Sequence, residues 1–315
     1  MPSGWANRSL LDPATAAHRV HSFARGVEGL GSLVLTRTFA TEFDRLARRT
    51  GPLCVGIDPS SSLLNVWDLP DDAEGARTFG LRVVDAASET VAVVKPQAAY
   101  FERFGWSGFR AMQDVCSAAQ AAGLLVILDA KRGDIGDTSG AYAQGYLGPA
   151  PAAFPIDALT AVPYLGVTAL RPMFDAARAS GRVVFVVVRS SNAEGFLIQT
   201  ATSESGRSVE GEVMVELARF NASDSEEVGA AGAVFAANTA RPPPAPLDEM
   251  KGLFLVPGLG HQGGTVDQVA QVFADCPRRV IPSVSRGVLV RGPDVKALRA
   301  AIARQAGELR AALSW

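Results

Sequence analysis

Five charged side chains stand where predicted strands end, and together they could act on a bound anion. Asp58 follows the run CVGI, Lys95 follows VAVV, and Asp129, Lys131 and Asp134 follow LLVIL. Residues two apart in an extended chain share a face, so Asp129 and Lys131 should project to the same side, with Asp134 just beyond them. A fixed ammonium stabilises developing negative charge, and a neighbouring carboxylate repels an anionic substrate group. The array therefore predicts electrostatic catalysis.

The same charges could instead form a salt-bridge network that only holds the strand ends together. Such networks perturb pKa values without doing chemistry. However, buried ion pairs stabilise a fold poorly compared with apolar packing, and three successive strands rarely carry them by chance. We therefore favour the catalytic interpretation.

Eight apolar runs alternate with helical patterns and supply these strand ends. The runs span residues 53–57, 91–94, 124–128, 158–162, 183–188, 233–237, 253–256 and 280–284. Helical spacing is found at residues 73–90, 108–122, 170–179, 209–220, 266–273 and 294–313. Strict alternation of this number predicts an α/β fold, a (β/α)8 TIM barrel, rather than an open Rossmann sheet. The strand ends of a barrel converge on one face, where active sites are built.

One barrel domain over residues 41–315 accounts for the pattern, after an N-terminal extension over residues 1–40. The extension contains four arginines but lacks the apolar run and cleavage pattern of a secretory signal. A transit-like segment and an over-long start are both open, and we expect a loosely ordered, non-catalytic segment. The Pro-rich stretch 241–246 lies between the sixth and seventh predicted strands, so we interpret it as a stiff surface loop rather than a linker.

Composition and charge argue against several classes of protein. A net charge of −2 gives no electrostatic case for nucleic acid or an anionic membrane. No apolar run approaches the length of about 20 residues that spans a bilayer. Cys54, Cys116 and Cys276 are odd in number and far apart, which is typical of reduced thiols in a cytoplasmic protein.

Histidine supplies little material for a metal site. The chain has three histidines, His18, His21 and His261. The spacing of the first two would suit a helical metal pair, but no carboxylate or cysteine cluster accompanies them, so a polar tail is the better interpretation. We expect no metal ion.

Two glycine-rich stretches indicate a phosphate site. They span residues 257–264 and 283–287 and follow the seventh and eighth predicted strands. Barrels commonly bind phosphate there, using backbone N–H groups and an arginine fork. Glycine-rich sequence alone could be a tight turn, but Arg286 at this place favours a phosphorylated substrate. The small polar residues at 189–192 could bind a heterocycle or form an ordinary polar turn.

The phrase DAKRGDI at residues 129–135, with Thr138 after it and Asp58 and Lys95 before it, resembles the signature of the orotidine 5'-phosphate decarboxylase family. The phrases VVKPQAAYFERFG and VPGLGHQGG resemble the longer bacterial branch of that family. The similarity runs from about Phe39 to the end. A related decarboxylase and aldolase group shares the D-x-K-x-x-D core, so that phrase alone does not fix the substrate.

The resemblance implies a role for each matching residue. Asp58, Lys95, Asp129 and Lys131 would form the charged network of one subunit, while Asp134, Ile135 and Thr138 would reach into the neighbouring subunit's site, making the active unit a homodimer. Ser191 would contact the amide edge of the pyrimidine. Gln262, Gly263, Arg286 and Gly287 would bind the phosphate. Three positions depart from the family pattern: Ala193 stands in place of a proline, and Leu259 and His261 stand where the phosphate loop usually has Tyr and Ala.

The implied reaction is decarboxylation of orotidine 5'-phosphate to uridine 5'-phosphate and CO2 in de novo pyrimidine biosynthesis. Lys131 would protonate C6 of a carbanion-like intermediate, without metal or organic cofactor. Two alternatives are open: a metal-dependent sugar-phosphate decarboxylase or aldolase of the same barrel group, and a non-catalytic barrel that binds a nucleotide.

Overall fold

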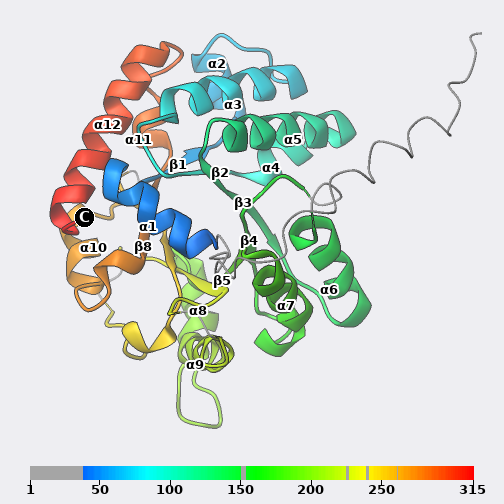
Figure 1. Ribbon diagram of the computed structural model, residues 1–315, viewed down its shortest axis with the longest axis vertical. Coiled ribbons are helices and arrows are strands. Elements are labelled where there is room, and N and C mark those ends of the chain that lie inside the picture. Colours follow the sequence, from blue (N-terminus) through cyan, green and yellow to red (C-terminus); the bar gives the residue numbers. More distant parts are fainter. Residues whose placement is uncertain (1–37, 150–153, 225–226, 239–240, 261) are drawn as a thin grey trace, which may run out of the picture. The chain divides into compact units, whose positions relative to one another are not determined.

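Eight parallel strands pair in chain order, and the last pairs with the first to close a barrel (Figure 1). A computed structural model describes residues 38–149, 154–224, 227–238, 241–260 and 262–315. The predicted (β/α)8 barrel is therefore confirmed. The strands are β1 (Cys54–Ile57), β2 (Val93–Pro96), β3 (Leu125–Arg132), β4 (Ala158–Ala161), β5 (Val183–Arg189), β6 (Ala231–Phe235), β7 (Phe254–Val256) and β8 (Val280–Val284).

Helices surround the barrel and connect successive strands (Figure 1). They are α1 (Phe39–Thr50), α2 (Ser61–Val66), α3 (Ala73–Ala87), α4 (Ala98–Glu102), α5 (Gly105–Ala121), α6 (Gly136–Tyr142), α7 (Arg171–Ser180), α8 (Phe196–Gln199), α9 (Val209–Asn221), α10 (Val266–Val272), α11 (Arg286–Leu289) and α12 (Val295–Ala312). A π-helical turn, Ala143–Leu147, continues α6. Short 3₁₀ turns span Val167–Leu170, Ala193–Gly195, Asp248–Met250 and Pro277–Arg279.

Alternate residues of each strand face two different cores. Val55 and Val184 belong to the larger cluster between the strands and the helices, whereas their neighbours Cys54 and Phe185 belong to a cluster inside the barrel. Both faces of every strand are thus apolar, which explains the nearly continuous apolar runs in the sequence.

Helix α1 covers the N-terminal ends of the strands. The Phe39 N–H donates to the Gly181 carbonyl just before β5 at 2.7 Å, and its ring packs edge-on against Phe185 at 6.0 Å between centroids. The barrel is therefore plugged at this end, and the opposite end is left for a site. The expected extension lies almost wholly outside the described residues, as do His18, His21 and His261.

The strands differ most from prediction at β3. We expected it to end at Leu128, but it runs to Arg132 and so contains Asp129 and Lys131. Its pairing with β4 is irregular between Leu128 and Arg132, which lets the charged end turn away from the apolar register.

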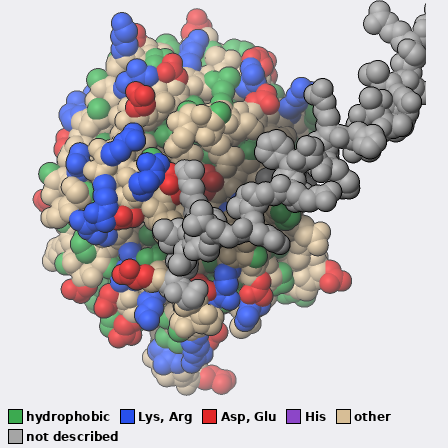
Figure 2. All heavy atoms as spheres, in the orientation of Figure 1, with side chains coloured by type: hydrophobic (Ala, Val, Ile, Leu, Met, Phe, Trp, Pro, Cys, Tyr) green, Lys and Arg blue, Asp and Glu red, His purple; other side chains and the backbone are tan. Residues whose placement is uncertain are grey.

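Acidic and basic side chains lie among one another over the face drawn in Figure 2. No helix in the described part of the chain is both long and apolar enough to cross a membrane.

Candidate active site

A cavity of about 350 Å³ opens at the C-terminal ends of the strands. Charged and polar groups from the first four strands lie on one side, and the loops that follow β5, β7 and β8 form the other. The lining residues are Asp58, Lys95, Asp129, Lys131, Thr160, Val187, Ser190, Ser191, Asn192, Val234, Leu255, Pro257, Gly258, Leu259, Gln262, Ser283, Ser285 and Arg286.

Asp129 is held between two ammonium groups. Its Oδ2 accepts a hydrogen bond from Lys95 Nζ at 2.9 Å, and its Oδ1 accepts one from Lys131 Nζ at 2.6 Å. Lys95 and Asp129 are each only 9% exposed, whereas the Lys131 side chain is 48% exposed at the cavity. The pair Lys95–Asp129 is thus buried, and Lys131 is the ammonium that a bound molecule can reach.

The pKa values of this buried pair follow from opposing effects. Burial alone would raise the pKa of Asp129, but the charges of Lys95 and Lys131, with their hydrogen bonds, hold it well below its usual range. Burial would likewise lower the pKa of Lys95, but Asp129 and then Asp58 hold it above its usual range. Both groups are therefore charged across the physiological range.

Thr160, on β4, fixes both Asp129 and Lys131. Its hydroxyl donates to Asp129 Oδ1 at 2.9 Å and accepts the Lys131 backbone N–H at 2.9 Å. Lys131 has a positive φ of 45°, a conformation that costs a non-glycine residue about 1–2 kcal/mol. Thr160 was not among the predicted site residues, although it is the one polar residue in the predicted strand ALTAV.

Asp58 is held by Ser285, which directly follows the neighbouring strand β8. The Ser285 hydroxyl donates to Asp58 Oδ2, while Asp58 Oδ1 is buried without a hydrogen-bond partner among the described residues. One carboxylate oxygen on the β1 side of the cavity is therefore left without a hydrogen bond from the described residues. Ser285 lies in the stretch SVSRG but was not among the predicted site residues.

Two of the four residues predicted to bind phosphate line the cavity. Gln262 and Arg286 line the cavity, whereas Gly263 and Gly287 do not. Gly263 has a positive φ of 85°, so its contribution is conformational. Leu259, a departure from the family pattern, is 8% exposed and lines the cavity.

Asn238, which follows β6, connects the two loops on this side. Its Nδ2 donates to the Ser191 carbonyl at 3.3 Å and to the Gln262 carbonyl at 3.1 Å. Gly258 has φ 99°, and a Cβ there would lie 3.3 Å from both Asn238 Nδ2 and Ser191 Cβ. The loops after β5 and β7 are therefore closely packed, and sequence reasoning gave no signal for Asn238.

Three more predicted site residues do not line the cavity of their own chain. Ile135 is 60% exposed, and Asp134 Oδ1 accepts the Ile135 N–H at 2.8 Å. Thr138 lies on α6 and is exposed. These side chains stand beside the mouth of the barrel rather than in it.

Comparison with known proteins identifies the family of this chain. Residues 51–301 match the family model described as Orotidine 5'-phosphate decarboxylase / HUMPS family. The Orotidine 5'-phosphate decarboxylase of Streptomyces coelicolor is 46% identical over 276 residues, covering 88% of this chain and 98% of the relative. The protein of the same name from Salinispora arenicola is 45% identical over 277 residues, 88% of this chain and 99% of its own.

A solved structure extends the likeness to three dimensions. The crystal structure of a Streptomyces avermitilis protein is 44% identical, covers 92% of this chain and all of its own, and superposes with a TM-score of 0.84. The match in sequence covers most of the chain, and the resemblance stated above is confirmed. The chain belongs to the orotidine 5'-phosphate decarboxylase / HUMPS family.

Proposed function

We propose that this protein decarboxylates orotidine 5'-phosphate to uridine 5'-phosphate and CO2, a step of de novo pyrimidine biosynthesis. The observation that carries the proposal is Asp129 fixed between Lys95 and Lys131 at the base of the cavity. The curated relatives that cover most of the chain carry the name of this activity.

The chemistry follows from the two charges at the end of β3. The bond between C6 and the carboxylate breaks, CO2 leaves, and the electron pair stays on C6. Lys131 stabilises this negative charge and transfers a proton from Nζ to C6, and the amine then regains a proton from water. Asp129 faces the departing carboxylate, and two unit charges about 4 Å apart repel by roughly 4 kcal/mol at an effective dielectric near 20.

Binding far from C6 offsets this repulsion, because such contacts contribute to the rate when they are realised in the transition-state complex. Arg286 and Gln262 would bind the phosphate, with Gly263 and Gly287 shaping their loops. Asp58 Oδ1, which has no hydrogen-bond partner among the described residues, would accept a hydrogen bond from a ribose hydroxyl. Ser191 would contact the amide edge of the pyrimidine.

We also propose that the active unit is a homodimer. Asp134, Ile135 and Thr138 lie outside the cavity of their own chain and are exposed or partly exposed, as residues donated to a neighbouring site would be in a single chain. An isologous pair would complete both sites at once. Three buried free thiols favour the reducing cytoplasm as its location.

The main rival is a metal-dependent sugar-phosphate decarboxylase or aldolase. In the described residues no three His, Cys, Asp or Glu side chains form a metal-binding group. Asp129 is instead engaged by two lysines. This arrangement favours the orotidine reaction, which needs an ammonium beside the reacting carbon. A silent nucleotide-binding barrel is disfavoured, because a binder gains nothing from a carboxylate that faces an anion.

The test is absorbance-monitored conversion of orotidine 5'-phosphate by the purified protein in excess chelator. We expect full turnover, with uridine 5'-phosphate as the product. Turnover that chelator abolishes would move the assignment to the metal-dependent relatives, and nucleotide binding with no CO2 release would move it to the silent barrel.

A further inference from the structure

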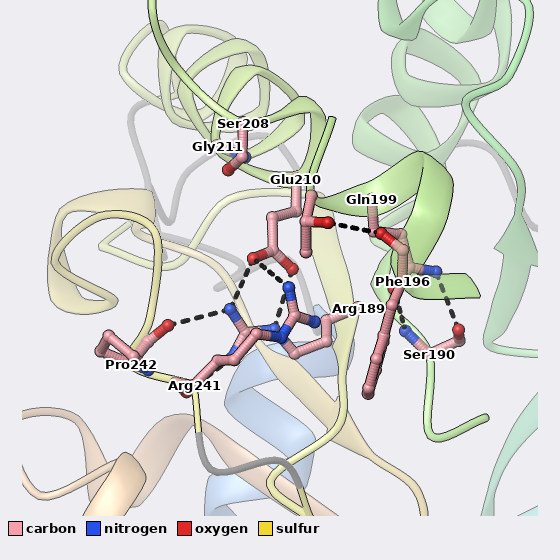
Figure 3. Close-up of polar contacts among 10 residues, drawn as sticks. Arg189, Ser190, Phe196, Gln199, Ser208, Glu210, Gly211, Arg241 and Pro242 are labelled. Carbon is pink, nitrogen blue, oxygen red and sulfur yellow. Dashed lines mark hydrogen bonds and ion pairs between the residues drawn. The ribbon is translucent and has the colours of Figure 1, made fainter. Parts of the chain in front are cut away.

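A buried ion pair lies just outside the cavity, behind the loop that follows β5. Arg189, the last residue of β5, is 1% exposed, and Glu210 in the first turn of α9 is 4% exposed. Arg189 Nε and Nη2 donate to the two Glu210 oxygens at 2.8 and 2.7 Å (Figure 3). Buried pairs stabilise poorly compared with apolar packing, but a bidentate arginine–carboxylate pair fixes the relative position of the two segments that it joins.

The pair joins segments that are far apart in the sequence. Arg189 also donates to the carbonyls of Arg241 and Pro242 at 3.1 and 3.0 Å. The Arg241 guanidinium lies over the Phe196 ring, with Cζ 4.5 Å from the ring centroid, and its Nη1 donates to Glu210 Oε1 at 3.4 Å. The Pro-rich loop after β6 is thus anchored to the end of β5 and to α8. The prolines of this loop restrict its backbone conformations, so the loop is a stiff support for the ion pair.

Gln199, at the end of α8, holds the next residue of the chain by two hydrogen bonds. Its Oε1 accepts the Ser190 N–H at 3.2 Å, and its Nε2 donates to Ser190 Oγ at 2.8 Å. Figure 3 shows the Gln199 amide directed toward Ser190, with the Arg189–Glu210 pair beside it. Ser190 therefore has its backbone fixed at one side by the ion pair and its side chain fixed by Gln199.

The segment held in this way forms part of the cavity wall. Ser190, Ser191 and Asn192 all contribute to its wall. The Ser191 carbonyl is held in addition by Asn238. Gln199 does not line the cavity, so it touches no ligand there and acts only through the serine segment.

We propose that Gln199, supported by the Arg189–Glu210 pair, is a positioning residue that presents Ser190–Asn192 to the heterocyclic base of the substrate. This inference rests on the proposed function, since it takes the ligand to be a nucleoside monophosphate with a base on the β5 side and a phosphate on the Arg286 side. A prepositioned hydrogen-bonding segment loses less entropy on binding than a mobile one.

The experiment separates base recognition from phosphate recognition. Inhibition constants are measured for uridine 5'-phosphate, which has the base, and for ribose 5-phosphate, which lacks it. In Gln199→Leu, which removes both bonds to Ser190, we expect inhibition by uridine 5'-phosphate to weaken about tenfold, while inhibition by ribose 5-phosphate is unchanged.

Two further variants make the result specific. Gln199→Glu keeps an acceptor for the Ser190 N–H, and the rotatable Ser190 hydroxyl can donate to it, so most of the affinity should return. Gln113→Leu changes an exposed glutamine on α5 and should leave both constants unchanged.

Each other outcome overturns the inference. Equal weakening of both ligands in Gln199→Leu would indicate general distortion of the mouth, and unchanged binding of both would indicate that Ser190 needs no positioning. Failure of the unaltered protein to bind uridine 5'-phosphate would overturn the proposed function as well. The unaltered protein therefore tests the proposed function, and the Gln199 variants test the positioning role.

Discussion

Lys131 Nζ lies 2.6 Å from Asp129 Oδ1, and the two residues are separated by one position in β3. A carboxylate and an ammonium so close on one strand end can act on two atoms of the same ligand. In the proposed reaction the ammonium would stabilise the carbon that gains charge, and the carboxylate would repel the group that leaves.

Replacing Lys131 with alanine should remove turnover while the fold and binding of uridine 5'-phosphate persist. Because the variant loses both the stabilising charge and the proton, the rate should fall by more than about a thousandfold. Lys251→Ala is a matched control, since Lys251 also has a positive φ, 51°, and lies outside the cavity. Decarboxylation retained in the Lys131 variant would refute its role as the acid.

Thr160→Val should reduce kcat about 10- to 100-fold with little change in KM. Valine keeps the shape but neither donates to Asp129 nor accepts the Lys131 N–H, so the two charges lose their shared support. We expect Thr160→Ser to restore most of the rate. Steady-state kinetics of both variants check this, and a valine variant with the unaltered kcat would show that the hydroxyl is dispensable.

Arg286→Ala should weaken inhibition by uridine 5'-phosphate about 100-fold and leave the weak binding of uridine unchanged. Arg286 lines the cavity on the side where the phosphate is expected, and uridine has no phosphate for its guanidinium to bind. Arg291→Ala, an exposed arginine shortly after it, serves as the control. If inhibition by uridine 5'-phosphate is the same in Arg286→Ala as in the unaltered protein, the phosphate binds elsewhere.

The stability of the protein should depend on Asp129 at low pH. Its pKa is lowered in the folded state from an ordinary value of 3.8, so its contribution is fully present above that value and is lost as the pH falls toward the folded one. The contribution of Lys95, whose pKa is raised from 10.5, is lost only as the pH rises beyond that value. Denaturant unfolding between pH 5 and pH 3 should show a steeper loss of free energy for the unaltered protein than for Asp129→Asn. Equal slopes would mean that Asp129 titrates alike in the folded and unfolded states.

The proposed dimer predicts complementation between two inactive variants. If Asp134 acts in the neighbouring site, a mixed dimer of Lys131→Ala and Asp134→Ala chains has one site with both changes and one with neither. Equal mixing and reassociation should then restore about a quarter of the unaltered activity. No recovery, with mixed dimers verified by mass, would place Asp134 in the site of its own chain.

The barrel could be predicted because each strand carries its own signal. Apolar runs that are buried on both faces occur eight times, and eight strands that alternate with helices are the number that closes a (β/α)8 barrel. Helix α1 was missed, although Thr38 caps it through a capping box, because its apolar residues Phe39, Phe43 and Leu46 plug the barrel instead of covering a strand.

The charged part of the site was predicted from residue type and position alone. Asp58, Lys95, Asp129 and Lys131 do line one cavity, because strand ends converge on it. Thr160, Ser285, Asn238 and Gln199 were not predicted. Thr160, Asn238 and Ser285 bond to partners that are 29, 47 and 227 positions away, and Gln199 bonds to a backbone N–H. Such pairings depend on tertiary packing that the pattern of a single sequence does not encode.

The mouth of the barrel divides chemistry from recognition along the chain. The charges proposed to react come from β3, with Lys95 of β2 and Asp58 after β1 beside them, whereas the groups proposed to hold the base and the phosphate follow β5, β7 and β8. Gene duplication and loop exchange could therefore alter the second set while the first is inherited intact. A designer who wished to present a different carboxylated ring to the same lysine would graft new loops onto the later strands and leave the first half of the chain as it is.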